Sequence, residues 1–383
     1  MSVAPSLRTV RGTVDVRFTP NRPTDRLLFR LWPNAPTARE EGVRLEVGRI
    51  PGARVARPDP TILVVRVGPI AAGQRVHVRV PWTLRVPPAG FDRIARFPGG
   101  LRLGSFFPIL AWDPRRGWVT DPPARSLGES STSPTADFAV HVRTPRGLTA
   151  FVSHGHSVRD VAVAVGRFRV ARGIAHAPDR VNVRVAVARG ADADPAAFLR
   201  MAIRALERLS RRYGAYAWPE YTVVIPRDFD AGGIEYPTLS FVGARFAPVA
   251  VVDHETAHQW FYSLVGNDQA RDPWLDETLA TWAQQRIDGL MRPSARLPAG
   301  ARRHVGAPMS YWARFPRAYF RGVYDVGAGA LRSLRNDAAV DCALRAYAAR
   351  RAHSIAQPGD LLDELNRVIP GAERRLRAWG IHR

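Results

Sequence analysis

The sequence predicts an α+β protein of two domains, in which an all-β N-terminal domain precedes a mainly helical one. The length of 383 residues exceeds what a single hydrophobic core usually serves. Apolar residues recur with a period of two up to residue 188, and this period changes after Gly190. Apolar residues make up 46% of the chain and charged residues 23%, which is typical of globular proteins. We therefore expect domains at residues 1–190 and 191–383.

The N-terminal prediction depends on apolar residues that alternate with polar ones. The pattern is clear in four runs, at residues 14–18, 76–82, 138–142 and 181–187. A strand with this alternation buries one face and exposes the other. The joints between the runs are rich in proline and glycine, which favour turns. We expect a sandwich-like arrangement of twisted sheet.

The C-terminal half carries helix signals. Asp194 followed by Pro195 is typical of a helix start. One apolar stripe then follows at helical spacing, formed by Phe198, Met201, Ala205 and Leu209. These signals predict a helix to about Tyr213, a short buried strand at residues 221–225, and mostly helix beyond it.

The net charge of +22 raises the question of an anionic partner. The chain contains no lysine, so all 56 basic residues are arginine, and they are scattered singly with only short runs. This distribution favours a coding bias over a basic binding surface. We therefore expect neither nucleic acid nor an anionic membrane as a partner.

Two further features bear on the cellular context. Cys342 is the single cysteine, which excludes an internal disulfide. No stretch approaches the roughly 20 apolar residues that span a bilayer, and the first thirty residues lack the apolar run of a signal peptide. As written, the chain is expected to be cytoplasmic, or exported if an upstream segment was trimmed.

The segment VVDHETAHQW contains the strongest chemical signal. His254 and His258 are four residues apart, a spacing that places both imidazoles on one face of a helix, where they can bind one ion. Glu255 follows His254 directly, so it cannot comfortably join the same ligand pair. It can instead reach a metal-bound water as a general base.

A catalytic zinc site needs a third protein ligand and one open position. Glu277 meets this need, since it follows His258 after eighteen intervening residues in a segment that is predicted to form a second helix from about Trp274. Asp276 beside it either hydrogen-bonds a ligand imidazole or is a solvated cap. The predicted metal ligands are therefore His254, His258 and Glu277.

At this point the chain resembles the zinc aminopeptidases of the gluzincin group, peptidase family M1. HETAHQW and the glutamate of WLDE match the zinc signature of that family. GGIEYP at residues 232–237 resembles its strand beside the substrate, and YDVGAGAL from Tyr324 resembles its tyrosine helix start. The segments FRLWPNAP and LGSFFPILAWD are similar to its β domain.

The resemblance implies a thermolysin-like catalytic domain that binds one zinc ion per chain. It implies that Glu255 activates water and that Tyr324 stabilises the oxyanion, with Tyr319 as the competing tyrosine. It also implies that Glu235 pairs with the ammonium group of a peptide with a free N-terminus. Gly232 and Gly233 would let the backbone approach this substrate, although glycines before a strand are often simply a turn.

Three positions depart from the family pattern. Tyr236 replaces an asparagine, Thr278 replaces the glycine after the zinc glutamate, and Val326 replaces a lysine. None of these departures removes a metal ligand, so they affect substrate geometry more than zinc binding. The chain also resembles a short form of the family, without its large C-terminal helical domain.

Three functions from different classes are compatible with these residues. The first is an aminopeptidase, which requires a free substrate amine. A thermolysin-like endopeptidase shares the metal chemistry without that requirement. A catalytically silent peptide-binding module would normally have lost a ligand, whereas this sequence keeps all of them. The preferred N-terminal residue and the oligomeric state are not predicted by the sequence.

Overall fold

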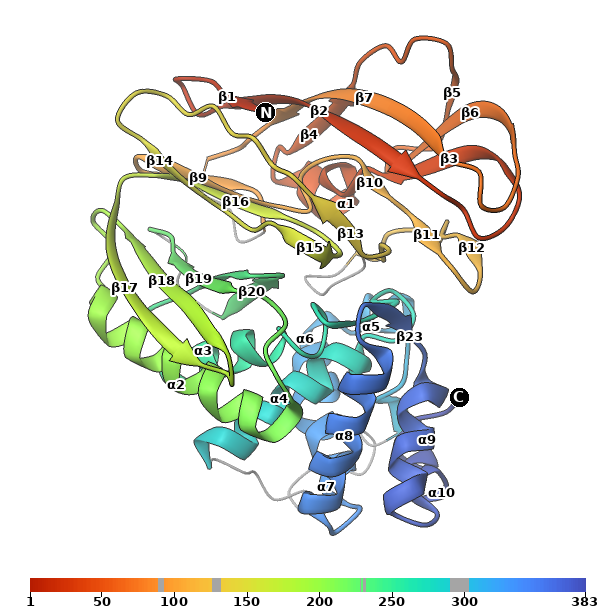
Figure 1. Cartoon of the computed structure of the whole chain (residues 1–383), viewed down its shortest axis with the longest axis vertical. Helices are drawn as coiled ribbons and strands as arrows, with labels where there is room; N and C mark the ends of the chain where they lie inside the picture. Colours follow the sequence, from red (N-terminus) through yellow and green to blue (C-terminus); the bar gives the residue numbers. More distant parts are fainter. Residues whose placement is uncertain (89–92, 126–131, 228, 230–231, 290–302) are drawn as a thin grey trace. The chain divides into compact units, whose positions relative to one another are not determined.

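The structure is a computed structural model that describes residues 1–88, 93–125, 132–227, 229, 232–289 and 303–383 (Figure 1). The chain forms two compact units. The first unit contains Met1–Arg125 and Thr132–Arg167, and the second contains Phe168–Arg383. The first is built of strands and the second carries the long helices, which confirms the predicted α+β class.

The two units divide before strand β17 (Phe168–His176), whereas the sequence places the boundary near residue 190. Strand β17 pairs along its whole length with β18 (Arg180–Ala188), which in turn pairs with a strand of the second unit, β19 (Glu220–Ile225). Both strands therefore belong to the second unit. A period of two identifies a strand but not the sheet that it joins.

Among the described residues of the first unit, three sheets have the strand orders β1-β2-β7-β4, β10-β3-β6-β5 and β14-β16-β9-β8. The strands are β1 (Ser2–Val3), β2 (Thr9–Phe18), β3 (Thr24–Arg30), β4 (Arg44–Val47), β5 (Arg54–Asp59), β6 (Ile62–Ile70), β7 (Val76–Arg85), β8 (Ala95–Phe97), β9 (Gly100–Gly104), β10 (Ile109–Leu110), β11 (Trp112–Asp113), β12 (Gly117–Trp118), β13 (Ala136–Phe138), β14 (Thr149–Val152), β15 (Gly155–Val158) and β16 (Ala162–Gly166). The short helices η1 (Trp32–Asn34) and α1 (Pro36–Glu40) lie between β3 and β4.

The predicted alternation is clearest in β7. Val78, Val80 and Trp82 are buried in the core of the first unit, while His77 and Arg79 are exposed. The apolar face of the strand packs inside the unit and the charged face meets solvent, as a period of two requires.

The second unit contains a mixed sheet with the order β17-β18-β19-β21-β20. Strands β18, β19 and β21 (Leu239–Val242) are parallel to one another, whereas β17 and β20 (Gly233–Tyr236) are antiparallel to their neighbours. Strand β20 therefore lies at an edge of this sheet. The 235–236 segment that the sequence associates with substrate is thus on an edge strand.

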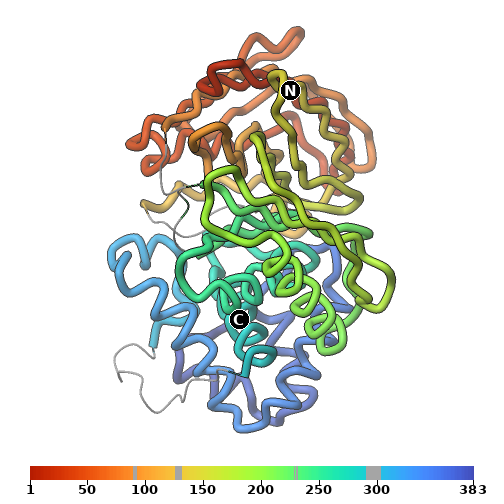
Figure 2. The backbone as a smooth tube through the Cα atoms, turned by 90° about the vertical axis from the view of Figure 1, so that its left-hand side faces the viewer, coloured from red at the N-terminus to blue at the C-terminus, as the bar shows by residue number. Residues whose placement is uncertain are grey.

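Helix α2 (Pro195–Tyr213) begins where the sequence predicts. The side chain of Asp194 accepts hydrogen bonds from the backbone N–H groups of Ala196 and Ala197, each at 3.1 Å, and Pro195 occupies the first turn. The helix packs against β17 and β18 (Figure 2). The residues that it buries are mostly apolar. Its arginine-rich face points the other way, towards solvent and the neighbouring helices.

Further helices complete the second unit. They are α3 (Pro248–Ala257), α4 (Trp274–Asp288), α5 (Met309–Trp312), α6 (Pro316–Tyr319), the π-helical turn η4 (Phe320–Asp325), α7 (Val326–Arg332), α8 (Asp337–Arg351), α9 (Pro358–Val368), α10 (Ala372–Leu376) and η5 (Arg377–Trp379). The short strands β22 (Val265–Asn267) and β23 (Ser354–Ala356) pair in parallel.

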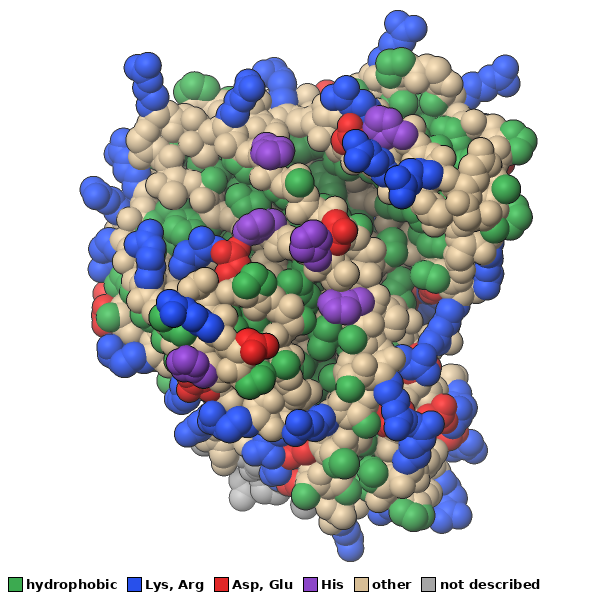
Figure 3. All heavy atoms as spheres, viewed as in Figure 1, with side chains coloured by type: hydrophobic (Ala, Val, Ile, Leu, Met, Phe, Trp, Pro, Cys, Tyr) green, Lys and Arg blue, Asp and Glu red, His purple; other side chains and the backbone are tan. Residues whose placement is uncertain are grey.

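The surface is consistent with the scattered charge of the sequence. On the face drawn in Figure 3 the basic side chains are spread as separate groups, with acidic and apolar side chains between them. Within the ranges that the structure describes, the helices are all too short or too polar to cross a membrane.

Candidate metal centre

The side chains of interest converge from four elements of the second unit: β20, α3, α4 and the π-helical turn η4. Helix α3 packs against α4, β20 and β21, and η4 packs against α4. Residues far apart in the sequence thereby meet at the C-terminal end of α3. Each of these elements is held by contacts within the same unit.

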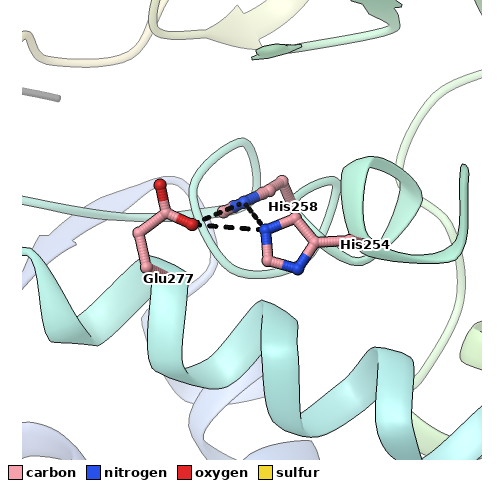
Figure 4. A group of neighbouring side chains, drawn as sticks. All are labelled: His254, His258 and Glu277. Carbon is pink, nitrogen blue, oxygen red and sulfur yellow. Dashed lines mark hydrogen bonds and ion pairs between the residues drawn. The ribbon is translucent and has the colours of Figure 1, made fainter. Parts of the chain in front are cut away.

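His254, His258 and Glu277 point their donor atoms at one another (Figure 4). The Oε2 atom of Glu277 lies 3.2 Å from His254 Nε2 and 3.3 Å from His258 Nε2, and the two nitrogens are 3.1 Å apart. His258 and Glu277 are buried, at 1% and 3% exposure. The predicted ligand set is therefore brought together at one point.

This donor set fits zinc. Two imidazole nitrogens and one carboxylate oxygen are the ligands of many catalytic zinc sites. Ligand atoms bound tetrahedrally to zinc at about 2.0–2.2 Å lie roughly 3.3–3.6 Å from each other. The separations of 3.1–3.3 Å between the three donors are close to that value. A small adjustment of the side chains would seat one ion.

The expected helical spacing holds with one difference. Helix α3 ends at Ala257, so His258 caps the helix rather than lying inside it. The backbone of His258 remains helical, with φ −62° and ψ −12°, and its N–H donates to the His254 carbonyl. Both imidazoles therefore still lie on one face. The Nδ1–H of His258 donates to the Phe261 carbonyl at 3.0 Å, which leaves Nε2 as the ligand atom.

Asp276 takes neither of the two roles considered from the sequence. It is fully buried, so it is not a solvated cap. Its Oδ1 accepts from the backbone N–H of Glu277 at 2.7 Å, and its Oδ2 accepts from Gln269 Nε2 at 2.8 Å rather than from an imidazole. Burial, and then the charge of Glu277, raise the pKa of Asp276 to about 8.

An ion pair that the sequence analysis missed fixes helix α3. Arg204 Nη2 lies 2.8 Å and 2.9 Å from the two carboxylate oxygens of Asp253, the residue before His254. Asp253 is fully buried, so this pair ties α3 to α2 beside a predicted ligand. The available signal was Asp253 itself, a carboxylate that follows two apolar residues and directly precedes a predicted metal ligand.

Two more carboxylates lie around His258. Donor atoms of Glu235, Glu255 and His258 fall within 4.8 Å of one another, and all three residues are buried. Burial alone would lower the pKa of His258, but the charges of Glu235 and Glu277 raise it well above its usual value. The region is thus strongly negative, which suits a bound cation.

The structure favours glycine at positions 232 and 233 for two different reasons. A Cβ on Gly233 would lie 2.3 Å from Cγ of Glu255, so β20 can approach this side chain only with glycine there. Gly232 has φ +66°, a conformation that other residues rarely adopt. Contact of either glycine with a substrate stays a prediction.

Tyr324 lies over the metal-ligand group. Its ring stacks on that of His254, with the centroids 5.5 Å apart and the planes at 13°. Burial, and then the charge of Glu277, raise the pKa of Tyr324 well above its usual value. Tyr319 is fully buried and packs edge-on against Tyr324 at 5.9 Å. Of the two tyrosines considered, Tyr324 is the one stacked on a predicted ligand.

The surroundings of Tyr324 include a conformation that no sequence pattern predicted. The segment Phe320–Asp325 forms a π-helical turn before α7. Such turns are rare and are frequent at functional sites. The resemblance places a helix start here, and α7 begins two residues after Tyr324.

Comparison with known proteins gives matches in sequence and in fold. Residues 198–305 match the model of the peptidase family M1 domain. The chain is 38% identical over 89 residues to Aminopeptidase RNPEPL1 of Mus musculus, an alignment that covers 21% of this chain and 12% of that protein. It is 36% identical over 86 residues to Aminopeptidase B of Rattus norvegicus, covering 21% and 13%. The matched region is thus a small part of these relatives.

Solved structures resemble nearly the whole chain. The M1 zinc metallopeptidase from Deinococcus radiodurans superposes with a TM-score of 0.69 at 19% identity, covering 98% of this chain and 91% of that one. A two-domain M1 zinc metallopeptidase mutant bound to L-tryptophan gives 0.71 at 19% identity, covering 100% and 92%. At this identity the likeness concerns the fold. Residues 198–305 therefore carry the similarity to the peptidase family M1 domain, and the solved structures share the two-domain fold.

Proposed function

We propose that this protein is a zinc-dependent aminopeptidase that removes N-terminal residues from peptides and binds one zinc ion per chain. The observation that carries the proposal is the convergence of His254, His258 and Glu277 on one point, with Glu235 and Glu255 buried beside it. The relatives named above are aminopeptidases, and a similar structure contains a bound amino acid.

His254, His258 and Glu277 would hold the metal through Nε2, Nε2 and Oε2. Zinc bound there would supply Lewis acidity, which lowers the pKa of water from about 16 towards about 7 and polarises a carbonyl. The reaction also needs groups that the residues around the metal would supply. These residues act as a base, an oxyanion donor and a substrate anchor.

Glu255 is the proposed general base. It is buried, at 4% exposure, and its carboxylate lies near His258 without belonging to the three-donor group. It accepts the proton of the attacking water and then delivers that proton to the leaving amine. Gly233 keeps the strand close to this carboxylate, which limits the positions that it can adopt.

Tyr324 is the proposed oxyanion donor. A phenol stays protonated at neutral pH, so its O–H can donate to the negative oxygen that develops in the transition state. Stacking on His254 holds this phenol beside the ligand group. Removing one such donor typically costs about 2.7–4 kcal/mol, or roughly 100-fold or more in kcat.

Glu235 is the proposed anchor for the substrate ammonium group. It is 3% exposed on the edge strand β20, and it lies beside His258. A buried carboxylate forms a strong charge-assisted hydrogen bond with an ammonium group. This residue favours the aminopeptidase over the endopeptidase, because cleavage inside a peptide needs no free amine.

Metal content and cleavage of aminoacyl reporter substrates test the proposal. Wild-type protein should contain one zinc per chain and lose activity with a chelator. His258→Ala and Glu277→Ala should lose zinc and activity together, whereas His382→Ala, at an exposed position, should change neither. Metal-free protein that still cleaves the reporters would overturn the proposal.

A further inference from the structure

Thr278 connects the two sides of the candidate site. It follows Glu277 on helix α4, and its hydroxyl donates to the backbone carbonyl of Val323 at a distance of 2.6 Å. Val323 precedes Tyr324 in the π-helical turn η4. One buried hydroxyl thus joins the residue after a predicted metal ligand to the residue before the predicted oxyanion donor.

The packing around this hydrogen bond is tight. Thr278 is fully buried. A Cβ on Gly327 of α7 would lie 2.1 Å from Thr278 Oγ1, and a Cβ on Gly322 would lie 2.3 Å from the ring of Trp312. Two glycines therefore let the backbone around Tyr324 close onto α4 and onto Trp312. The space around the hydroxyl is therefore too small for a larger group unless the turn shifts.

The π-helical turn explains why a side chain is needed here. In such a turn the regular i→i−4 hydrogen bonds of the α-helix are interrupted, and a side chain that inserts can stabilise the altered backbone. Thr278 makes this contact. The family pattern quoted above has glycine at this position, which carries no hydroxyl.

We propose that Thr278 is a positioning residue that holds the phenol of Tyr324 over the metal-ligand group. The inference rests on the proposed function, because it assigns a task to Tyr324. The ring of Tyr324 stacks on His254 at 5.5 Å, and its backbone is attached to α4 one residue away from Glu277. A misplacement of about 1 Å at a catalytic group can reduce the rate about 100-fold.

Thr278→Val tests the role of the hydroxyl. The substitution puts a methyl group where Oγ1 now lies, but a methyl carbon needs roughly 3.3 Å or more from a carbonyl oxygen. Because Oγ1 is 2.6 Å from the Val323 oxygen, the turn must move away. We expect kcat to fall at least about tenfold, with KM and zinc content unchanged. Thr278→Ser keeps the hydroxyl and should retain near-normal kcat.

Thr281→Val is the matched control. Thr281 lies one turn further along α4, is 4% exposed, and its hydroxyl has no hydrogen-bond partner among the described residues. The same change of side chain in the same helix should leave kcat within about twofold of wild type. Equal losses in Thr281→Val and Thr278→Val would mean that any change in α4 has this effect, which contradicts the proposal.

A double-mutant cycle with Tyr324→Phe separates positioning from general disruption. If Thr278 acts through the phenol, adding Thr278→Val to Tyr324→Phe should reduce kcat by less than about twofold. An equal loss with and without the phenol would overturn the inference, as would loss of zinc in Thr278→Val. Wild-type protein without zinc or peptidase activity would instead refute the proposed function itself.

A structural readout makes the test independent of activity. A crystal structure of metal-free Thr278→Val should show the separation of the His254 and Tyr324 rings increased beyond 5.5 Å, while Thr278→Ser keeps that separation. An unmoved Tyr324 in the valine variant would contradict the proposal. The same crystals report whether Thr278→Val has kept the fold.

Discussion

Glu255 illustrates how two adjacent residues acquire different tasks. His254 directs its Nε2 at Glu277, whereas the carboxylate of Glu255 lies on the side of Glu235 and His258. The local sequence already separates a ligand from a base, because neighbouring residues on a helix point in different directions. The neighbourhood of Glu235 could not be inferred from spacing, since it depends on how β20 packs against α3.

Glu255→Gln should retain zinc and lose nearly all turnover. The amide keeps the shape of the carboxylate but cannot accept the proton of the attacking water. We expect kcat to fall at least about 100-fold with one zinc still bound, as measured by elemental analysis and reporter cleavage. Loss of zinc, or near-normal turnover, would show that the roles of metal ligand and general base are assigned to the wrong residues.

Asp160 is a buried carboxyl group in the first unit, with no role in the proposed chemistry. It accepts hydrogen bonds from Ser105 Oγ and from the N–H of Val161, each at 2.6 Å. Burial raises the pKa of Asp160 to about 7, although Ser105, Val161, Arg93 and Arg159 act in the opposite direction. The folded state therefore holds this proton up to a higher pH than the unfolded chain does.

The sign of the resulting pH effect follows from linkage. The stability contribution of Asp160 is fully present below about pH 4, where both states are protonated, and is lost as the pH rises to about 7. Asp160→Asn stays neutral, so the variant should gain a few kcal/mol relative to wild type between pH 4 and 7. Urea unfolding across this range measures the difference. A difference that does not vary with pH would contradict the assigned pKa.

Among the elements, α2 was predictable because its signals are local. Asp194, Pro195 and one apolar stripe determine where the helix starts and which face is buried. The membership of β17 and β18 in the second unit depends on pairing with β19, which follows α2 in the chain. The π-helical turn accepts a hydrogen bond from Thr278, more than forty residues before it. Such distant contacts leave no trace in a local pattern.

One carboxylate connects three helices of the second unit. Asp341 of α8 accepts hydrogen bonds from Tyr213 Oη of α2 and Trp282 Nε1 of α4, each at 2.9 Å. Its other oxygen pairs with Arg212 at 2.6 Å and Arg286 at 2.8 Å. The side chain of Asp341 is 8% exposed, so these partners replace most of its water.

Asp341→Asn should destabilise the second unit by about 2–4 kcal/mol, because it removes the charged partner of Arg212 and one of the two charged partners of Arg286 in a largely buried site. Asp337→Asn is the control: Asp337 pairs with Arg286 at 3.3 Å but is 33% exposed. Its loss should cost no more than about 1 kcal/mol. Urea unfolding of the two variants and of the wild type measures both changes in the free energy of unfolding. Equal effects would mean that Asp341 does not hold the helices together.

At the scale of the whole molecule, the fold class and the convergence of His254, His258 and Glu277 could be inferred, because the imidazole spacing is local and the number of residues between His258 and Glu277 matches a known signature. The contacts that hold the elements of the site together could not be inferred from the sequence. The Arg204–Asp253 pair and the Thr278–Val323 hydrogen bond join residues about fifty positions apart. These contacts follow from helix packing, which a single sequence does not specify residue by residue.

The central claim is that this chain is an aminopeptidase, and one comparison tests it most directly. The measurement is kcat/KM for one peptide with a free and with an acetylated N-terminus, in wild type and in Glu235→Ala. A charge-assisted hydrogen bond of roughly 1.5–3 kcal/mol between Glu235 and the ammonium group predicts at least about a tenfold loss on acetylation. Glu235→Ala should remove this preference and keep its zinc. Equal cleavage of both peptides at an internal bond by the wild type would contradict the account and identify an endopeptidase.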